Sequence, residues 1–286
     1  MKNSGSSKIC LISLLPNLWL SIFYLLPLIA ILVLSFKDAD SFGSFASTWS
    51  CTAFKEAIKN YHLLLKTLTL AIPATIITVL LAIPVAWALA NVNSKWRNFL
   101  LALVLIPYWT SFLIRIHAWK ILLHPEGNIA FVLKFLNLMP QDGMLLYNYY
   151  AILAVTCYAY LPFAILPIYS SAEKFDKTLL EAAKDLGASN GQAFFKVFIP
   201  GISAGIFSAV LLVFIPTLGS YLIPDLIGGP SDRLLGNLIA DRVFTERNLP
   251  GAGAISSCLL IFVLFIISIA SIIKKLKSNK LKEDEI

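Results

Sequence analysis

Six long apolar segments constrain this chain more than any other feature of its sequence. They cover residues of about 11–36, 65–90, 99–121, 147–169, 201–224 and 252–273. A run of about 20 apolar residues is long enough for one helix to cross the hydrocarbon core of a bilayer. The sequence therefore predicts an all-α, polytopic membrane protein with six transmembrane helices, in a single domain over residues 1–286.

Composition indicates the same class. Of the 286 residues, 58% are hydrophobic and only 14% are charged, whereas soluble domains carry about 25% charged residues. These values exclude a soluble domain and a disordered chain. The four cysteines are far apart in the sequence and the three histidines form no ligand motif, so no metal site is predicted.

Prolines occur within most of the predicted spans, at positions 16, 27, 73, 84, 107, 162, 167 and 216. Proline breaks a soluble helix because it has no amide N–H group to donate. Within a membrane, neighbouring helices or water can bond to the carbonyl groups that proline leaves free. We therefore expect kinked helices that surround a pathway.

The basic residues predict the topology. In a membrane protein, excess Lys and Arg lies on the cytoplasmic side, so the net charge of +7 is no sign of nucleic-acid binding. With a cytoplasmic N-terminus, the inner segments hold thirteen Lys and Arg residues and the outer segments seven. Both termini are therefore predicted to be cytoplasmic. The outer segments also hold nine Asp and Glu residues against seven inside, which either attract a cation or are ordinary solvated residues.

The connection between the fourth and fifth spans, residues 170–200, is long and has a helical pattern. Its first helix carries one apolar stripe, formed by Leu179, Leu180, Ala183 and Leu186. Gly187 can end that helix in the left-handed conformation, and Ser189 with Gln192 forms a capping box that begins a second helix. Two such helices either lie on the membrane surface or dock into another protein.

The same loop carries a motif. Glu181-Ala182-Ala183, followed by Gly187 and by Ile199-Pro200, resembles the EAA loop of ABC importer permeases, although Ile199-Pro200 lacks the usual leucine. In that family the loop forms coupling helices that sit in a groove of a cytoplasmic ATPase. The resemblance implies an ATPase-coupling role for Glu181, Ala182, Ala183, Gly187, Ile199 and Pro200.

Segments 106–123, 161–189 and 221–239 are similar to the PotB-type permeases of bacterial spermidine/putrescine importers. This resemblance implies a type I ABC importer permease fold in the lipid of the bacterial inner membrane, with transport by alternating access. It also implies three partners: a second permease similar to PotC, an ATPase similar to PotA that uses ATP and Mg, and a periplasmic polyamine-binding protein similar to PotD. The chain itself is expected to bind no cofactor and to have no catalytic residue.

A polyamine pathway needs carboxylates or carbonyl groups for the ammonium ions and aromatic faces for cation–π contacts. The candidates are Tyr108, Trp109, Phe112, Tyr158, Tyr160, Tyr221 and, at the outer end of the fifth span, Asp225. Aromatic residues of membrane helices also serve in the core or at the membrane interface, and this alternative stays open for each of them.

Arg115 is an intramembrane cation, which is costly in lipid unless it is paired or faces protein. A pathway for cations gains nothing from an unpaired arginine, because like charges repel. We expect Arg115 to pair with an acid or to bond to helix carbonyl groups near the outer surface. An interface between two permeases is another place for it.

Other functional classes have weaker support in the sequence. Residues 201–205 match the G-x-S-x-G pattern of hydrolases. That pattern requires a strand-to-helix turn with His and Asp partners, but the same residues form a GxxxG pair that lets helices approach closely.

A secondary transporter usually has intramembrane acids, and a membrane enzyme needs an acid cluster, a metal site or a triad. The chain has no G-x-x-x-x-G-K-[ST] motif for ATP. A permease for another small solute is the main alternative.

Overall fold

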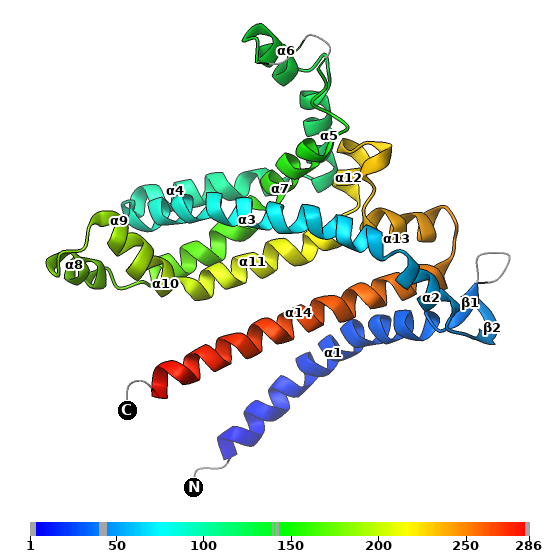
Figure 1. The fold of residues 1–286 in the computed structure, drawn as a ribbon. Helices are drawn as coiled ribbons and strands as arrows, with labels where there is room; N and C mark the ends of the chain where they lie inside the picture. Colours follow the sequence, from blue (N-terminus) through cyan, green and yellow to red (C-terminus); the bar gives the residue numbers. More distant parts are fainter. Residues whose placement is uncertain (1–3, 40–44, 139, 141–142, 284–286) are drawn as a thin grey trace. The chain divides into compact units, whose positions relative to one another are not determined.

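A computed structural model of the chain describes residues 4–39, 45–138, 140 and 143–283, and it is mainly helical (Figure 1). Lys2, Asp40 and Asp142, which contribute to the predicted charge distribution, lie outside the described residues. The chain divides into two compact units: a terminal unit of Met1–His62 with Leu238–Ile286, and a central unit of Leu63–Asn237. That the two units act as one permease domain stays a prediction.

The terminal unit contains two long helices and a small hairpin. Its elements are α1 (Ser4–Leu34), β1 (Lys37–Ala39), β2 (Phe45–Trp49), α2 (Thr52–Lys59) and α14 (Leu249–Glu283). The two strands pair antiparallel, which adds a small β-element to the predicted all-α fold. Helix α14 packs against α1 and α2. A Cβ atom at Gly253 would lie 2.8 Å from Ser35 Oγ, so α1 and α14 approach closely where this glycine lies.

The central unit is a bundle with several short helices at its ends. Its elements are α3 (Tyr61–Asn91), α4 (Ser94–Leu105), a 3₁₀ turn (Ile106–Trp109), α5 (Phe112–Leu123), α6 (Asn128–Phe135), α7 (Tyr149–Glu173), α8 (Thr178–Asp185), α9 (Asn190–Ala193), a π-helical turn (Phe194–Phe198), α10 (Ile199–Gly201), α11 (Ser203–Leu218), α12 (Leu222–Ile227), a second 3₁₀ turn (Pro230–Asp232) and α13 (Leu235–Phe244), which extends into the terminal unit. Helices α7 and α11 run along each other (Figure 1). Apolar side chains of α3, α7 and α11, such as Val79, Ile168 and Val213, are buried together between them.

Among the described residues, four helical segments are long and apolar enough to cross a membrane by themselves: Pro16–Leu34, Tyr61–Asn91, Tyr149–Glu173 and Leu249–Ile269. Two bent pairs pass the same test, Ser94–Trp109 with Phe112–Phe135 and Asn190–Gly201 with Ser203–Leu218. When each pair is counted as one span, the total is six, which is the number that the sequence predicts.

The third and fifth predicted spans differ from the structure in detail. The segment 99–121 is broken after the 3₁₀ turn, where Pro107 lacks an N–H donor and Thr110 is extended at ψ 151°, and the two parts meet at 89°. The segment 201–224 ends as a helix at Leu218. Asp225 therefore lies on the separate helix α12 rather than at the end of the fifth span.

Candidate functional site

The predicted coupling motif lies on a helix with a well-defined end. Glu181-Ala182-Ala183 is part of α8, and Gly187 follows it with φ +90°. The Gly187 N–H group donates to the Lys184 carbonyl oxygen at 2.8 Å, and the Ala188 N–H group donates to the Ala183 carbonyl oxygen at 3.0 Å. These two bonds form a Schellman motif. The prediction that Gly187 ends the helix in the left-handed conformation is confirmed.

Side-chain hydrogen bonds also lie at the beginnings of both loop helices. Asp176 Oδ1 accepts hydrogen bonds from Thr178 N at 3.0 Å and from Thr178 Oγ1 at 2.8 Å, and these bonds hold the pKa of the Asp176 carboxyl below its ordinary value. At α9, Ser189 N donates to Gln192 Oε1 at 3.0 Å and Gln192 N donates to Ser189 Oγ at 3.3 Å. The predicted capping box is therefore confirmed.

The apolar stripe predicted for α8 faces two directions. Leu180 packs against the buried core of the bundle, whereas Leu179 is 52% exposed and Leu186 is 89% exposed. Leu179 and Leu186 are seven residues apart, which places them on the same side of a helix. Together with Phe195, which is 70% exposed, they leave the loop with uncovered apolar side chains.

An aromatic anchor, formed by Trp87, Phe175, Phe194 and Phe198, holds the second half of the loop against α3. The ring of Trp87 lies 4.3 Å from that of Phe198 and 5.5 Å from that of Phe194. Phe175 contacts Phe198 edge-on at 5.3 Å. Each such pair contributes about 0.5–1.5 kcal/mol beyond the burial of its surface. The loop is thus attached to the bundle as a rigid body.

Polar contacts attach the same loop at two further points. Arg97 of α4 forms an ion pair with Glu173 at the end of α7, at 2.7 Å. Lys177 Nζ donates to the carbonyl oxygen of Ala90 at 3.3 Å. Ala90 lies near the end of α3. These two contacts therefore join the first part of the loop, where it leaves α7, to α3 and α4.

The junction with α11 depends on close packing at two glycines. Ile199 is half-buried and Pro200 is exposed on α10. A Cβ atom at Gly201 would clash with the Phe175 ring, and one at Gly205 would lie 2.6 Å from the Pro167 carbonyl oxygen of α7. The prediction that this G-x-S-x-G match is a packing motif is confirmed, since both glycines lie against other elements.

The first two pathway candidates lie on the 3₁₀ turn before α5. Trp109 is 85% exposed. The Tyr108 hydroxyl donates to the carbonyl oxygen of Ala159 on α7 at 2.6 Å, and the guanidinium carbon of Arg115 lies 4.2 Å from the centre of the Tyr108 ring. Both the hydroxyl and one face of Tyr108 are therefore occupied by protein, and its place in a substrate pathway stays a prediction.

Arg115 is 8% exposed and lies in the first turn of α5. Its Nη2 atom donates to the Thr110 carbonyl oxygen at 3.3 Å, and its guanidinium also lies 5.9 Å from the ring of Phe112. Arg115 thus bonds to a carbonyl group, as expected, but to that of the extended residue Thr110 and not to one within a helix. Its Nε and Nη1 atoms have no hydrogen-bond partner within the part of the chain that the structure describes.

The other pathway candidates fall into two groups. Tyr160 joins Tyr108, because both rings contact Phe163, at 6.2 and 5.6 Å. Tyr221 precedes α12 and Asp225 is exposed in its first turn. The remaining candidate, Tyr158, has its ring 5.1 Å from that of Trp119.

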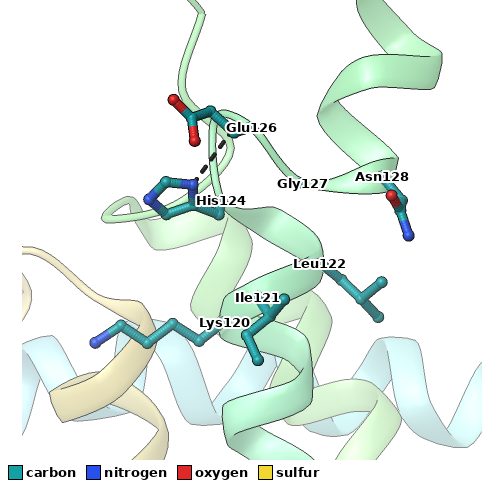
Figure 2. A pocket seen from close by; sticks show the side chains of 7 residues that line it. All are labelled: Lys120, Ile121, Leu122, His124, Glu126, Gly127 and Asn128. Carbon is teal, nitrogen blue, oxygen red and sulfur yellow. Dashed lines mark hydrogen bonds between the residues drawn. The ribbon is translucent and has the colours of Figure 1, made fainter.

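A pocket that the sequence does not predict lies where α5 joins α6 (Figure 2). It has a volume of about 420 Å³ and is lined by Lys120, Ile121, Leu122, His124, Glu126, Gly127 and Asn128. Glu126 N donates to His124 Nδ1 at 3.3 Å, and Figure 2 shows the Glu126 side chain above His124 and the Lys120 side chain below it. Within the described residues, no group of three or more His, Cys, Asp or Glu side chains could hold a metal ion.

Residues 79–282 match the family model of the inner-membrane component of binding-protein-dependent transport systems. The chain belongs to this family. Among family relatives, the spermidine/putrescine permease PotB of Haemophilus influenzae is 34% identical over 273 residues, which cover 92% of this chain and 93% of PotB. PotB of Escherichia coli K12 is 36% identical over 245 residues, which cover 85% of this chain and 89% of PotB. The predicted resemblance to PotB-type permeases is confirmed.

A solved structure supports the fold. The crystal structure of a bacterial ABC transporter that imports alginate matches with a TM-score of 0.62 and 18% identity, over 95% of this chain and 97% of that chain. The predicted ABC importer permease fold is confirmed. Inner-membrane components of this family are multi-pass transport subunits, which agrees with the apolar helices.

Three residues that support the loop are not predicted from the sequence: Trp87, Phe175 and Arg97. The available signal is the run of phenylalanines at 194, 195 and 198, because so many aromatic rings in a polar loop need partners on another element. The pattern does not indicate which span supplies them.

Proposed function

We propose that this chain is a permease subunit of an ATP-driven importer that moves spermidine and putrescine into the cytoplasm by alternating access. The similarity to PotB permeases over most of both chains supports the polyamine substrate. The proposed partners are a second, PotC-like permease, a PotA-like ATPase that uses ATP and Mg, and a PotD-like periplasmic binding protein. Both termini and the loop of residues 170–200 are placed in the cytoplasm.

The rigid attachment of the loop is the observation that carries the coupling mechanism. The aromatic anchor and the Arg97–Glu173 ion pair fix the loop to the bundle, while Leu179 and Leu186 are exposed. We propose that these apolar side chains enter the ATPase and that Glu181, which lies on another side of α8, makes a separate contact with it. When ATP closes the ATPase, movement of the loop then passes directly to α7 and α11, because packed elements move as rigid bodies.

For the substrate pathway, we propose two places. Asp225 and Tyr221 on and before α12 supply a carboxylate and an aromatic face for an ammonium group, and both are exposed. Tyr160 and Trp109 line a second part of the route. The neighbouring Tyr108, whose hydroxyl and one ring face contact protein, holds this part of the route in place.

Uptake measurements test the substrate. Cells with the intact gene, cells with the gene deleted and complemented cells are supplied with labelled spermidine and putrescine, with a labelled amino acid as the control solute. Deletion is expected to remove uptake of both polyamines and to leave the amino acid unaffected. Unchanged polyamine uptake in the deletion strain would overturn the substrate assignment.

A further inference from the structure

Two proline-freed carbonyl groups of the central unit have tyrosine partners. Pro73 lies inside α3 and Pro162 inside α7. A proline cannot donate to the carbonyl oxygen four residues before it, so Pro73 frees the oxygen of Thr69 and Pro162 frees the oxygen of Tyr158. In a lipid environment such a group needs another donor, because water is absent.

The donor at the first site comes from a different helix. The hydroxyl of Tyr149, at the start of α7, donates to the Thr69 carbonyl oxygen at 2.6 Å. This bond supplies what the N–H group of residue 73 would supply in a regular helix. It also joins α7 to α3 at the kink itself.

At the second site the donor lies on the 3₁₀ turn before α5 and the acceptors lie on α7. The Tyr108 hydroxyl lies 3.2 Å from the Tyr158 oxygen that Pro162 frees and 2.6 Å from the next carbonyl oxygen, that of Ala159. Arg115 stacks on the Tyr108 ring at 4.2 Å, which fixes the direction of the hydroxyl. The bend before α5 is thereby attached to the kink of α7.

We propose that Tyr149 and Tyr108 are positioning residues for transport, each with a hydroxyl that replaces the amide N–H missing at a proline. Each kink is attached to a neighbouring element, so α3, α7 and the turn before α5 move together when the bundle changes state. The transport part of this inference rests on the proposed function. The hydrogen-bond replacement does not, and it can be measured separately.

A double-mutant cycle on stability tests the replacement at Pro73. In the full chain, purified in detergent, Tyr149→Phe is expected to lower the apparent melting temperature by about 2–4 °C, the effect of one lost hydrogen bond in a protein of this size. In a Pro73→Ala background the alanine N–H can bond to Thr69, so the same substitution is expected to shift the melting temperature by less than about 1 °C.

The matched control is Tyr150→Phe. Tyr150 is adjacent and 78% exposed, and its hydroxyl makes no hydrogen bond within the described residues, so no shift is expected in either background. Equal shifts for Tyr149→Phe with and without Pro73 would overturn the proposal. In the cycle of Tyr108→Phe with Pro162→Ala, part of the shift is expected to remain, because the Tyr108 hydroxyl also donates to the Ala159 carbonyl oxygen at 2.6 Å. The Pro73 cycle therefore decides.

Uptake separates positioning from substrate contact. As a positioning residue, Tyr108 affects spermidine and putrescine alike, so Tyr108→Phe is expected to lower both uptake rates by the same factor. A changed ratio of the two rates would assign Tyr108 to substrate contact and overturn its positioning role. If the wild-type chain takes up neither polyamine, the proposed function fails, whereas the thermal cycles still decide the hydrogen-bond replacement.

Discussion

Gly187 sets the direction of the chain between the two loop helices. Its φ of +90° is open to glycine but costs about 1–2 kcal/mol for a residue with a Cβ atom. The Schellman bonds around it depend on that conformation. One backbone angle therefore determines the direction in which the chain leaves α8 toward α9.

Replacing Gly187 by valine is expected to abolish polyamine uptake while the protein still inserts, because the loop can no longer turn toward α9. Uptake and membrane abundance by immunoblot measure the two effects. Gly191→Ala is the matched control: a Cβ atom there meets nothing within 4 Å, and its φ is not positive, so uptake stays normal. Normal uptake by Gly187→Val would refute the coupling role of this turn.

Asp176 makes the stability of the folded loop depend on pH, and the direction of this dependence follows from its lowered pKa. Its pKa is lowered in the folded protein by hydrogen bonds from Thr178, so it stabilises the fold above the ordinary carboxyl pKa of about 3.9 and loses this contribution as pH falls through the lowered value. Asp176→Ala is expected to lower the apparent melting temperature at pH 7 but not at a pH below the lowered pKa. If Asp176→Ala lowers the melting temperature equally at both pH values, this role is contradicted. Thr178→Val should weaken the pH dependence of the melting temperature.

Local residues of the loop are predictable from the sequence, and their distant supports are not. Gly187 and the Ser189–Gln192 box depend on neighbours within one turn of helix, so their spacing is sufficient. Trp87 contacts Phe198 only because the bundle brings two spans together. No periodicity in either segment indicates that pairing.

At the scale of elements, the length of an apolar run predicts a straight span well and a broken one poorly. The runs that became α3 and α7 are continuous helices despite prolines inside them, since tyrosine hydroxyls bond to freed carbonyl groups in both. The run 99–121 breaks where Thr110 is extended, although apolar residues continue on both sides of the break. Hydropathy alone therefore cannot locate this bend.

The next prediction concerns the contact between α7 and α11, which is the most extensive one between described helices. Gly205→Leu is expected to destabilise the protein by about 1–3 kcal/mol, the usual cost of overpacking, because a Cβ atom there already meets Pro167 O and Ser171. Thermal unfolding in detergent measures the loss. Gly219→Ala serves as control, since its nearest neighbour is 4.0 Å away. Equal stability of Gly205→Leu and wild type would show that α11 does not pack here as described.

At the scale of the whole molecule, the distribution of Lys and Arg predicts that the loop of residues 170–200 and both termini lie on one side of the membrane. The hairpin and α2, between the first two spans, are then on the other side. Cys51, just before α2, is exposed, which provides a native probe for that side. Gly191, with open space around its Cβ position, offers a place for a probe in the loop.

Two single-cysteine chains test this topology. The first keeps Cys51 and carries Cys10→Ala, Cys157→Ala and Cys258→Ala; the second replaces Cys51 by alanine as well and adds Gly191→Cys. In spheroplasts, a membrane-impermeant maleimide is expected to label the Cys51 chain at once and the Gly191→Cys chain only after permeabilisation. Uptake by both chains confirms that they are assembled. The reverse labelling pattern would place the loop outside, where no cytoplasmic ATPase could reach it, and would remove the coupling mechanism along with the topology.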